Sequence, residues 1–450
     1  MPELRDVTRM NTKTIINRVK EAGVIGAGGA GFPTHLKIAA SVDTVIVNGA
    51  ECEPLLRVDQ ELMEKNTEEL INGLEFVRET TGAERVIIAL KAKYTKAIEN
   101  IKKLINNKRI YDIQELEDFY PVGDEQQLLY EVTGRIVPEG GIPLQVGAVV
   151  INVETVININ NALKQTPLTH KYLTISGAVK KPLTLLVPVG TLIKELLSVV
   201  GGTTVTDFQL LDGGPMMGKI VSPDAPVKKT TKGVLVLPEG HLLIRNKNTD
   251  IKFLLKRAMS VCAQCRACTD VCPRYLLGHS LEPHRIMRSI SYGIDSDSEV
   301  ITSALLCCEC GVCDTWGCPM GLSPRIINMH IKDELLKRNY KNTHNLSPEE
   351  TYIMREFRKV PAKRLIRRLD IHEYDRAAPL DLRELNPERV ELYLQQHIGD
   401  PSKPVVNVGE AVNKGQLIAK AAEASPGANI HTGISGRVRA VTENSVIIER

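Results

Sequence analysis

The chain has 450 residues, about three times the usual length of one domain, so two to four domains are expected. Its 57 basic and 54 acidic residues leave a formal charge of +3, and no Lys/Arg block is set among aromatic residues, which argues against a nucleic-acid partner. No run approaches the roughly 18 consecutive apolar residues of a membrane span, and residues 1–10 lack the apolar core of a signal peptide. We therefore expect a cytoplasmic protein.

A glycine-rich loop follows the first predicted helix, which covers residues 11–22. The loop reads GAGGAGFPTHLK, and three of its glycines match G-x-G-x-x-G: Gly26, Gly28 and Gly31. A Rossmann dinucleotide turn needs a strand before these glycines, whereas the first predicted strand here, 44–48, comes after them. The loop still presents backbone N–H groups that suit a flat or phosphorylated ligand.

Short apolar runs alternate with amphipathic stretches from residue 45 to about 163. Runs at 44–48, 85–90 and 148–152 predict strands, and the stretches 59–79 and 94–107 predict helices. This order predicts an α/β layer with a mainly parallel sheet. Two polar loops, 48–54 and 120–128, lie where loops of such folds carry function, and they hold four acidic residues: Glu51, Glu53, Asp124 and Glu125. Taken singly, each of these acids is interpreted as a solvated charge on a loop. If the four converge on one crevice, they would form a ligand site.

After residue 170 the pattern changes to strand, strand, helix, strand, strand within about 75 residues, which predicts a small β-grasp unit. Its loop at 213–219 contains two methionines that we interpret as packing residues.

Two cysteine runs follow. The first has the spacing C-x2-C-x2-C-x3-C-P, and the second differs only in having four residues before its last cysteine. Three thiolates of such a run hold one iron-sulfur cube and the fourth reaches a second cube. On this rule one 4Fe-4S cluster would bind Cys262, Cys265, Cys268 and Cys318, and the other would bind Cys307, Cys310, Cys313 and Cys272.

Zinc is the alternative occupant, because it also binds four thiolates from C-x2-C pairs, but zinc sites rarely repeat three such steps and a Cys-Pro twice. Thiolate-bound clusters indicate a reducing compartment. Cys52 and Cys308 remain outside the two sets. Cys308 could replace its neighbour Cys307 as a ligand, and an unreactive thiol is the other interpretation.

The chain divides into five expected segments. They are an α/β domain over 1–165, a β-grasp domain over 170–245, a helical two-cluster ferredoxin-type domain over 250–335, a helical linker over 336–395 and a barrel-sandwich β domain over 396–450. The last has the shape of a biotinyl or lipoyl carrier but no lysine at the expected hairpin tip, so we interpret it as structural.

These motifs together carry a family resemblance that covers nearly the whole chain. GAGGAGFPTHLK, VNGAECEP, YPVGDEQQLLYEVTGR, VINVETV and GGPMMG resemble the flavin- and NADH-binding core shared by the C subunit of the Rnf complex and the NADH-binding flavoprotein subunit of respiratory complex I. The order of parts, with the cluster motifs after the β-grasp (SLBB) unit and the sandwich at the C-terminal end, most resembles the cobalamin reductase family of propanediol-utilisation microcompartments. The Rnf subunit normally carries its sandwich segment at the N-terminus.

The resemblance implies FMN and NADH sites. Around FMN it implies Gly26, Gly28, Gly31, Lys37, Asn48, Glu51, Asn152 and Thr155. Toward the nicotinamide nucleotide it implies Phe32, Glu53, Asp124 and Glu125. One position departs from the complex I pattern N-A-D-E-x-E-P, because Ala50 stands where that pattern has Asp, which removes one polar contact to FMN.

We expect an NADH-oxidising iron-sulfur flavoprotein. NADH gives up two electrons together and a 4Fe-4S cube accepts one, so a flavin that releases electrons singly is the natural converter between them. No acid or base is required, and no catalytic proton-transfer residue is expected. The acceptor would be a partner reductase within a hetero-oligomeric complex or a corrinoid, in the cytoplasm or inside a bacterial microcompartment. The alternative is an electron-relay adaptor with a vestigial flavin site, which Ala50 favours.

Overall fold

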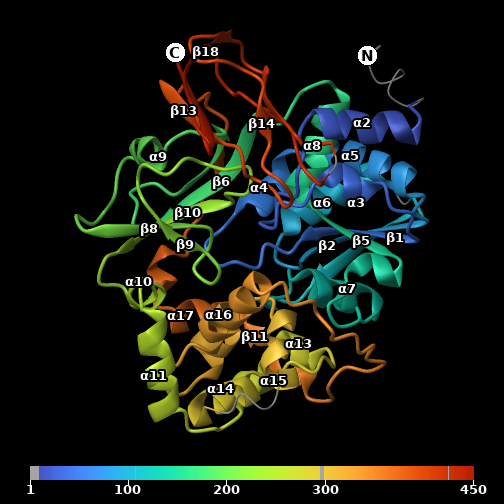
Figure 1. The fold of residues 1–450 in the computed structure, drawn as a ribbon. Coiled ribbons are helices and arrows are strands. Elements are labelled where there is room, and N and C mark those ends of the chain that lie inside the picture. Colours follow the sequence, from blue (N-terminus) through green and yellow to red (C-terminus); the bar gives the residue numbers. More distant parts are fainter. Residues whose placement is uncertain (1–9, 107, 294–297, 424) are drawn as a thin grey trace.

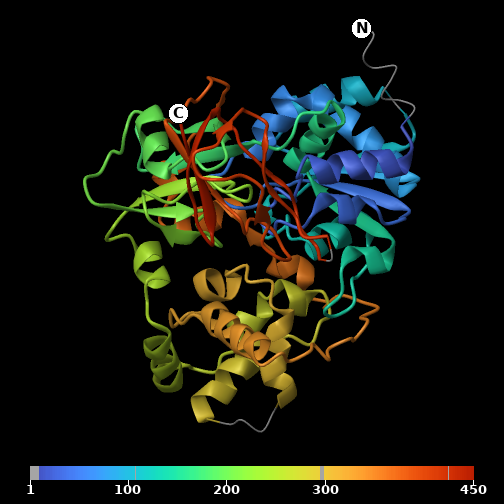
Figure 2. The same cartoon turned by 45° about the horizontal axis from the view of Figure 1, so that its top comes forward.

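The computed structural model describes residues 10–106, 108–293, 298–423 and 425–450. Figure 1 shows an α/β unit at the upper right, a mixed-sheet unit at the upper left and a helical unit below both. A fourth unit, the sandwich unit of β-strands, lies at the top, and in Figure 2 it comes forward between the α/β and mixed-sheet units. The N-terminal residues 1–9 of the expected first domain lie outside the described residues.

The α/β unit is built on a four-stranded parallel sheet of order β3-β2-β1-β5. Its strands are β1 (Thr44–Gly49), β2 (Arg85–Lys91), β3 (Tyr111–Leu116) and β5 (Ala148–Asn152). Its helices are α2 (Thr12–Glu21), α3 (Thr34–Ile38), α4 (Val58–Lys65), α5 (Thr67–Thr81), α6 (Thr95–Ile105), α7 (Glu125–Thr133) and α8 (Val153–Leu163). The expected parallel α/β layer is therefore confirmed.

Both faces of this sheet are covered, because successive side chains of a strand point to opposite faces. Val45 and Val47 of β1 pack with residues of α2, α4, α5, α6 and α8. Ile46, between them, packs on the other face with Leu128 and Leu129 of α7. The carboxyl ends of the strands, from which the polar loops leave, thus lie at one edge of a rigid layer.

Two helix predictions differ from the structure. The single helix expected over 59–79 is two helices, α4 and α5, separated by Asn66, whose φ of −117° and ψ of 37° leave the helical region. Asn followed by Thr and two glutamates is a helix-start signal that the apolar periodicity alone does not show. The helix expected over 94–107 covers Thr95–Ile105 and ends at Asn106 in a left-handed conformation, and residue 107 lies outside the described residues.

The mixed-sheet unit has a six-stranded sheet of order β12-β7-β6-β10-β8-β9. Its elements are β6 (His170–Gly177), β7 (Leu183–Pro188), α9 (Ile193–Val199), β8 (Phe208–Asp212), β9 (Lys219–Val221), β10 (Gly233–Pro238) and β12 (Leu380–Asp381). Ile193 and Leu196 of α9 pack on Leu173 and Val187 of the sheet. The expected strand–strand–helix–strand–strand order is confirmed, with the short edge strands β9 and β12 in addition.

The helical unit consists of short helices around a small apolar core. Its elements are α11 (Ile251–Val261), α12 (Ala267–Asp270), α13 (Pro273–Leu276), α14 (Pro283–Tyr292), α15 (Ser298–Thr302), η2 (Ser303–Leu306), η3 (Cys313–Gly317) and α16 (Pro324–Lys337). The helix before them, α10 (Leu242–Lys247), packs on the mixed-sheet unit through Leu243 and Ile244. Ala258, Ile286, Leu306 and Ile327 belong to the core of the helical unit. The predicted helical character between the cysteine turns is confirmed.

The segment 336–395 contains less helix than we expected. Residues 338–354 form neither helix nor strand, and after them come two 3-10 turns, η4 (Arg355–Arg358) and η5 (His372–Tyr374), with the α-helix α17 (Ala362–Arg368) between them. Backbone bonds from Glu139 to Leu346 and from Tyr352 to Leu276 hold the extended part between the α/β and helical units. The segment also supplies β11 (Val360–Pro361), which pairs with β4 (Phe119–Tyr120), and β12. Backbone groups of Leu346 and Tyr352 thus form hydrogen bonds with other units, in place of the bonds that they would make within a helix.

The sandwich unit has two antiparallel sheets, β13-β19-β18-β15 and β14-β16-β17. Its strands are β13 (Arg389–Tyr393), β14 (Lys403–Pro404), β15 (Ala411–Val412), β16 (Leu417–Lys420), β17 (Ile430–His431), β18 (Gly436–Val441) and β19 (Ser445–Glu449). Strand β13 begins before residue 396. Within the described part of the chain, none of the helices combines the length and apolar character that a membrane crossing requires.

Candidate cofactor sites

Each cysteine run forms a tight turn with the same backbone conformation. Gln264 and Arg266, on either side of Cys265, have φ values of 59° and 68°. Glu309 and Gly311, on either side of Cys310, have φ values of 61° and 79°. Left-handed residues before and after the middle cysteine turn the chain sharply, so that three thiols of one run converge.

Two cavities lie inside these turns, and thiols line both. Four cysteines line the first: Cys262, Cys265, Cys268 and Cys318. Five line the second, namely Cys272, Cys307, Cys310 and Cys313 of the expected set together with Cys308. The structure thus brings together the two crossed sets of cysteines that the spacing grouped.

The walls of the second cavity suit a group that can accept hydrogen bonds. Asn328 lines the second cavity and is fully buried; its side-chain amide faces the Cys307 thiol and has no hydrogen bond of ordinary geometry in the described part of the chain. Nε of Arg325, at the same cavity, is likewise unpartnered there. Buried donors without partners are expensive, and sulfide ligands of an iron-sulfur cube would accept from them. The residues present therefore fit such a cube.

The glycine loop lies between α2 and α3. A bridge between Ile25 and Pro33 closes it, and the backbone N–H of Gly26 donates to the Phe32 carbonyl at 2.8 Å. Ala27 N–H donates to Oγ1 of Thr155 at 2.9 Å, which fastens the loop to the first turn of α8. No backbone N–H of residues 28–31 has a hydrogen-bond partner among the described residues, and residues 28–30 are exposed. Free N–H groups on a loop without Cβ atoms at Gly28 and Gly29 fit a phosphate such as that of FMN.

At position 31, contacts with two neighbouring units leave room only for glycine. The φ of Gly31 is 68°, and a Cβ there would lie 3.0 Å from Cγ2 of Thr230 and 3.3 Å from the Gln396 carbonyl oxygen. The Gly31 carbonyl in turn accepts a hydrogen bond from the Ile398 N–H at 3.1 Å. The mixed-sheet unit and the sandwich unit therefore both press on one side of the loop and leave its other side open.

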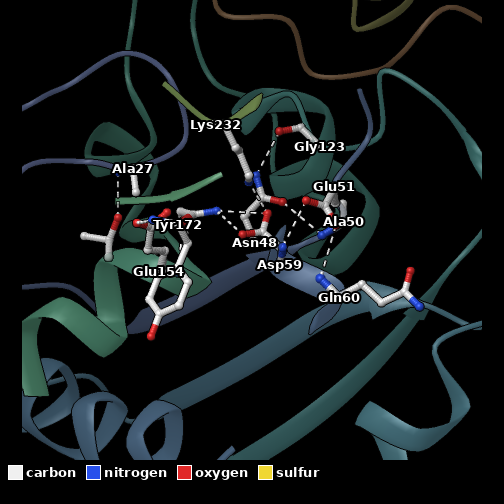
Figure 3. Close-up of polar contacts among 12 residues, drawn as sticks. Ala27, Asn48, Ala50, Glu51, Asp59, Gln60, Gly123, Glu154, Tyr172 and Lys232 are labelled. Carbon is white, nitrogen blue, oxygen red and sulfur yellow. Dashed lines mark hydrogen bonds and ion pairs between the residues drawn. The ribbon is translucent and has the colours of Figure 1, made fainter. Parts of the chain in front are cut away.

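A buried polar network lies beside the loop, and Figure 3 shows its residues converging. The carboxylate of Glu51 accepts hydrogen bonds from the backbone N–H groups of Asp59 and Gln60 at 2.9 and 3.2 Å, at the start of α4. Asp59 accepts two hydrogen bonds from Nδ2 of Asn152 at 3.0 and 3.1 Å and forms an ion pair with Lys232. Burial, and then the charge of Asp59, raise the pKa of Glu51.

Two lysines of the mixed-sheet unit enter the α/β unit at this place. Lys232, directly before β10, pairs with Asp59, and Lys171 of β6 pairs with Glu154 of α8. Burial would lower the pKa of Lys232, but the charges of Asp59 and Glu51 outweigh it and the pKa is raised. Both ion pairs are almost completely buried, so the position of the mixed-sheet unit is coupled to the floor of the candidate flavin site.

Four other predicted site residues lie near the ends of β1, α3 and α7 and on the glycine loop. Nδ2 of Asn48 donates to the Gly123 carbonyl, and Oδ1 of Asn48 accepts from the Ala50 N–H, so Asn48 joins the two loops. Lys37 of α3 pairs with Glu125 at 2.7 Å. The Phe32 side chain, on the glycine loop, is exposed.

Two of the predicted nucleotide contacts are engaged elsewhere in the chain. The carboxylate of Glu53 accepts from the backbone N–H groups of Met216 and Met217, at 3.0 and 2.8 Å. Asp124 pairs with Arg274 of the helical unit, at 2.6 and 2.9 Å. These acids therefore fasten the loops of the α/β unit to its neighbours, a use that the sequence pattern does not show because both partners lie far along the chain.

Asp59 and Lys232 are the candidate site residues that sequence reasoning missed. Asp59 looks like an ordinary first-turn acid of a helix, and Lys232 stands in a polar turn with no motif around it. Cys52, which the cysteine spacing leaves outside both sets, lines neither cavity, and burial raises its pKa to about 12.

Comparisons with known proteins agree with this arrangement. Models of four families match the chain: the Nuo51 FMN-binding domain at residues 19–161, the SLBB domain at 172–219, the 4Fe-4S dicluster domain at 261–323 and the RnfC barrel sandwich hybrid domain at 373–449. Fold and cofactor sites thus define the chain as an iron-sulfur flavoprotein oxidoreductase that transfers electrons through FMN and 4Fe-4S clusters.

The relatives identify the family. The chain is 44% identical over 445 residues to cobalamin reductase PduS of Citrobacter freundii, covering 98% of each chain, and 43% identical over 443 residues to that of Salmonella typhimurium, covering 98% of this chain and 97% of the relative. It is also 35% identical over 283 residues to the C subunit of the proton-translocating ferredoxin:NAD(+) oxidoreductase complex of Clostridium ljungdahlii, covering 61% of this chain and 59% of that one. The chain belongs to the cobalamin reductase PduS family.

Proposed function

We propose that this protein oxidises NADH and passes the electrons one at a time to a protein partner or to a corrinoid. FMN would take two electrons from NADH and release them singly, and two 4Fe-4S clusters would carry them onward. The observation that supports this most directly is the contact between the α/β unit and a cysteine cavity: the Tyr120 hydroxyl donates to the Cys310 carbonyl at 2.7 Å. Cavity and α/β unit are thereby in direct contact.

The residues would divide the work as follows. The N–H groups of residues 28–31 would bind the FMN phosphate, with Lys37 nearby, and Thr155 would hold the loop in place through Ala27. Glu51, Asn48 and Asn152 would form the polar floor under the ring system. Phe32 and Glu125 would face the nicotinamide nucleotide. None of these side chains needs to transfer a proton, so their task is to position the ring and exclude water.

The two four-cysteine sets would hold the clusters. The set Cys262, Cys265, Cys268 and Cys318 would bind one cube, and Cys272, Cys307, Cys310 and Cys313 the other. The experiment is anaerobic reconstitution followed by iron, sulfide, zinc and flavin measurement and then addition of NADH. We expect one FMN and two clusters per chain, and loss of flavin and cluster absorbance with NADH. Protein that contains both cofactors but is not bleached by NADH would refute the proposal.

Single substitutions test the ligand sets. Cys318→Ser and Cys272→Ser should each lose half of the bound iron, because each removes one ligand of one cube. Cys52→Ser is the matched control and should keep both clusters. Cys308→Ser distinguishes a spare thiol, which leaves the iron content unchanged, from a ligand.

An adaptor that relays electrons between other proteins of a complex is the second candidate, and Ala50 favours it. Ala50 is fully buried, and its methyl group cannot supply the polar contact that Asp provides in the complex I pattern. Flavin content per chain after mild purification separates the two functions: about one FMN supports the NADH-oxidising enzyme, and its absence after reconstitution supports the adaptor. We place the protein in the cytoplasm, or in a microcompartment if it shares the surroundings that the family resemblance suggests.

A further inference from the structure

The two cysteine cavities differ in what surrounds them. The cavity of Cys272, Cys307, Cys310 and Cys313 borders the α/β unit. Besides the bond from Tyr120 to Cys310, Nε2 of Gln127 donates to the Pro273 carbonyl at 2.7 Å, next to Cys272. Arg274, one residue further, pairs with Asp124 of the loop that carries the candidate nucleotide site. This cavity is the inner one, on the flavin side.

The cavity of Cys262, Cys265, Cys268 and Cys318 lies at the outer surface. All of its lining residues belong to the helical unit. Cys265 is exposed, and so are Pro319 and Met320 at the same wall. Electrons tunnel best over short distances, so a cluster in this outer cavity is the one that a docked molecule could reach.

Helix α11 continues this outer surface, because its last residue precedes Cys262. Figures 1 and 2 show α11 at the outer edge of the helical unit. Arg257 donates to the Met320 carbonyl at 3.2 Å, which places the helix beside the cavity wall. Phe253, one helical turn before Arg257, is 57% exposed, and Met259 is exposed as well. We call this patch the α11 surface: Lys252, Phe253, Lys256, Arg257, Met259 and Met320.

The α11 surface combines apolar contacts with unpaired positive charge. Lys252 and Lys256 are exposed, and neither they nor Arg257 forms an ion pair with any carboxylate in the described ranges. Two other cations of the helical unit are paired, Arg274 with Asp124 and Lys332 with Glu309. Exposed aromatic and Met side chains with an Arg among them are typical of the centre of a protein interface, and unpaired cations around them select a negatively charged partner.

We propose that the α11 surface is the docking site of a redox protein that carries an acidic face around its own cofactor, and that electrons leave through the outer cluster. The proposal rests on the proposed function for the source of the electrons. Oxidation of one NADH to NAD+ releases a proton and two electrons, so two one-electron carriers would dock and be reduced in turn. The inner cluster would lie between FMN and the outer one.

The test measures docking directly, without turnover. The probe is flavodoxin, an acidic protein that exchanges single electrons, and its affinity for the oxidised holoprotein is measured by biolayer interferometry at low and high salt. The double variant Lys252→Glu and Lys256→Glu should bind flavodoxin at least about tenfold more weakly than the parent, with a smaller salt dependence. Phe253→Ala should weaken binding roughly tenfold, because it removes an exposed apolar anchor.

Lys13→Glu with Lys20→Glu is the matched control. Both lysines are exposed on α2, in the α/β unit and away from α11 in Figure 1, and the double substitution changes the charge equally. It should leave the affinity within about twofold of the parent. Cytochrome c, a basic carrier, should not bind the parent. Equal binding of flavodoxin to both double variants, no binding to the parent, or equal binding of cytochrome c would each overturn the proposal.

Two further readouts separate failure of this inference from failure of the proposed function. NADH should bleach the flavin and clusters of both double variants as in the parent, because electron transfer within the chain does not involve the α11 surface. If the parent binds flavodoxin as expected but is not bleached by NADH, the proposed function alone is refuted. If NADH bleaches the parent but the Lys252→Glu, Lys256→Glu variant binds flavodoxin as tightly as the parent, this inference alone is refuted. If the α11 variants convert an oligomer of the parent to a monomer in light scattering, the surface is a contact between copies of this chain and the proposal is wrong.

Discussion

Lys232→Met should destabilise the protein strongly, because it leaves the Asp59 carboxylate buried without a counter-charge. The side chains of Lys232 and Asp59 are only 14% and 2% exposed. After the substitution Asp59 keeps the two hydrogen bonds from Asn152, but both come from one neutral amide and bring no charge. Removing one partner of a buried ion pair costs about 3–5 kcal/mol, and we expect the free energy of unfolding to fall by that amount.

The full loss of unfolding free energy in Lys232→Met should be measurable near neutral pH. The pKa of Lys232 in the folded protein is raised above its ordinary value, so the stability that its charge contributes is fully present below the unfolded pKa. This contribution is lost only as the pH rises through the folded pKa, which lies higher still. The same substitution should reduce FMN binding, since Asp59 and Asn152 would lose the arrangement that supports the candidate flavin site.

Urea unfolding followed by circular dichroism, with flavin content measured in parallel, tests this expectation. The control is Lys228→Met, on the same segment: Lys228 pairs with Asp212 at 2.8 Å, with side chains 34% and 12% exposed, and loss of such a partly exposed pair should cost about 0–1 kcal/mol. Adding Asp59→Asn to Lys232→Met should recover part of the loss, because it removes the stranded charge. If both lysine variants lose the same stability, or if Asp59→Asn recovers none, a buried unpaired charge is not the cause of the loss.

Three other predictions follow from single features. Asn328→Leu should make the midpoint potential of the inner cluster more negative, because it removes a buried amide that can donate to cluster sulfur; an EPR-monitored redox titration measures this, and an unchanged potential would refute that role. Lys229 is buried, with Nζ bonded to the Gly23 and Asn429 carbonyls, and burial lowers its pKa from 10.5 to about 7. The cost of this burial is complete below pH 7 and disappears toward pH 10.5, so the unfolding free energy of the parent should rise relative to Lys229→Met by up to about 1.4 kcal/mol per pH unit over this interval; parallel pH profiles would contradict it. Gly31→Ala should cost more stability and more FMN than Gly134→Ala, since both glycines have φ near 70° but a Cβ at Gly134 would meet nothing within 4 Å; equal losses in thermal unfolding and flavin content would show that the contact with Thr230 is unimportant.

The parts of this protein that depend on neighbours in sequence were predictable. Three cysteines of each run lie within seven residues, so their spacing alone predicts that they converge, and the turn residues Gln264 and Glu309 then adopt the same conformation. The alternation of apolar runs and amphipathic stretches predicted the parallel sheet, because side-chain period follows from local backbone geometry. The break at Asn66 was missed because a cap signal competed with a continuous apolar period.

Contacts between units were decided only by the tertiary structure. No local pattern shows that Lys232 neutralises Asp59, that Arg274 holds Asp124, or that Glu53 accepts from the backbone of Met216. These pairs form because burial of a charge is favourable only where packing brings a counter-charge or free N–H group to it, and that packing joins residues more than a hundred positions apart. The order of residues was enough to determine which cofactors the chain can hold. Tertiary packing decided which acids are left to face a substrate, and which cysteine cavity opens outward.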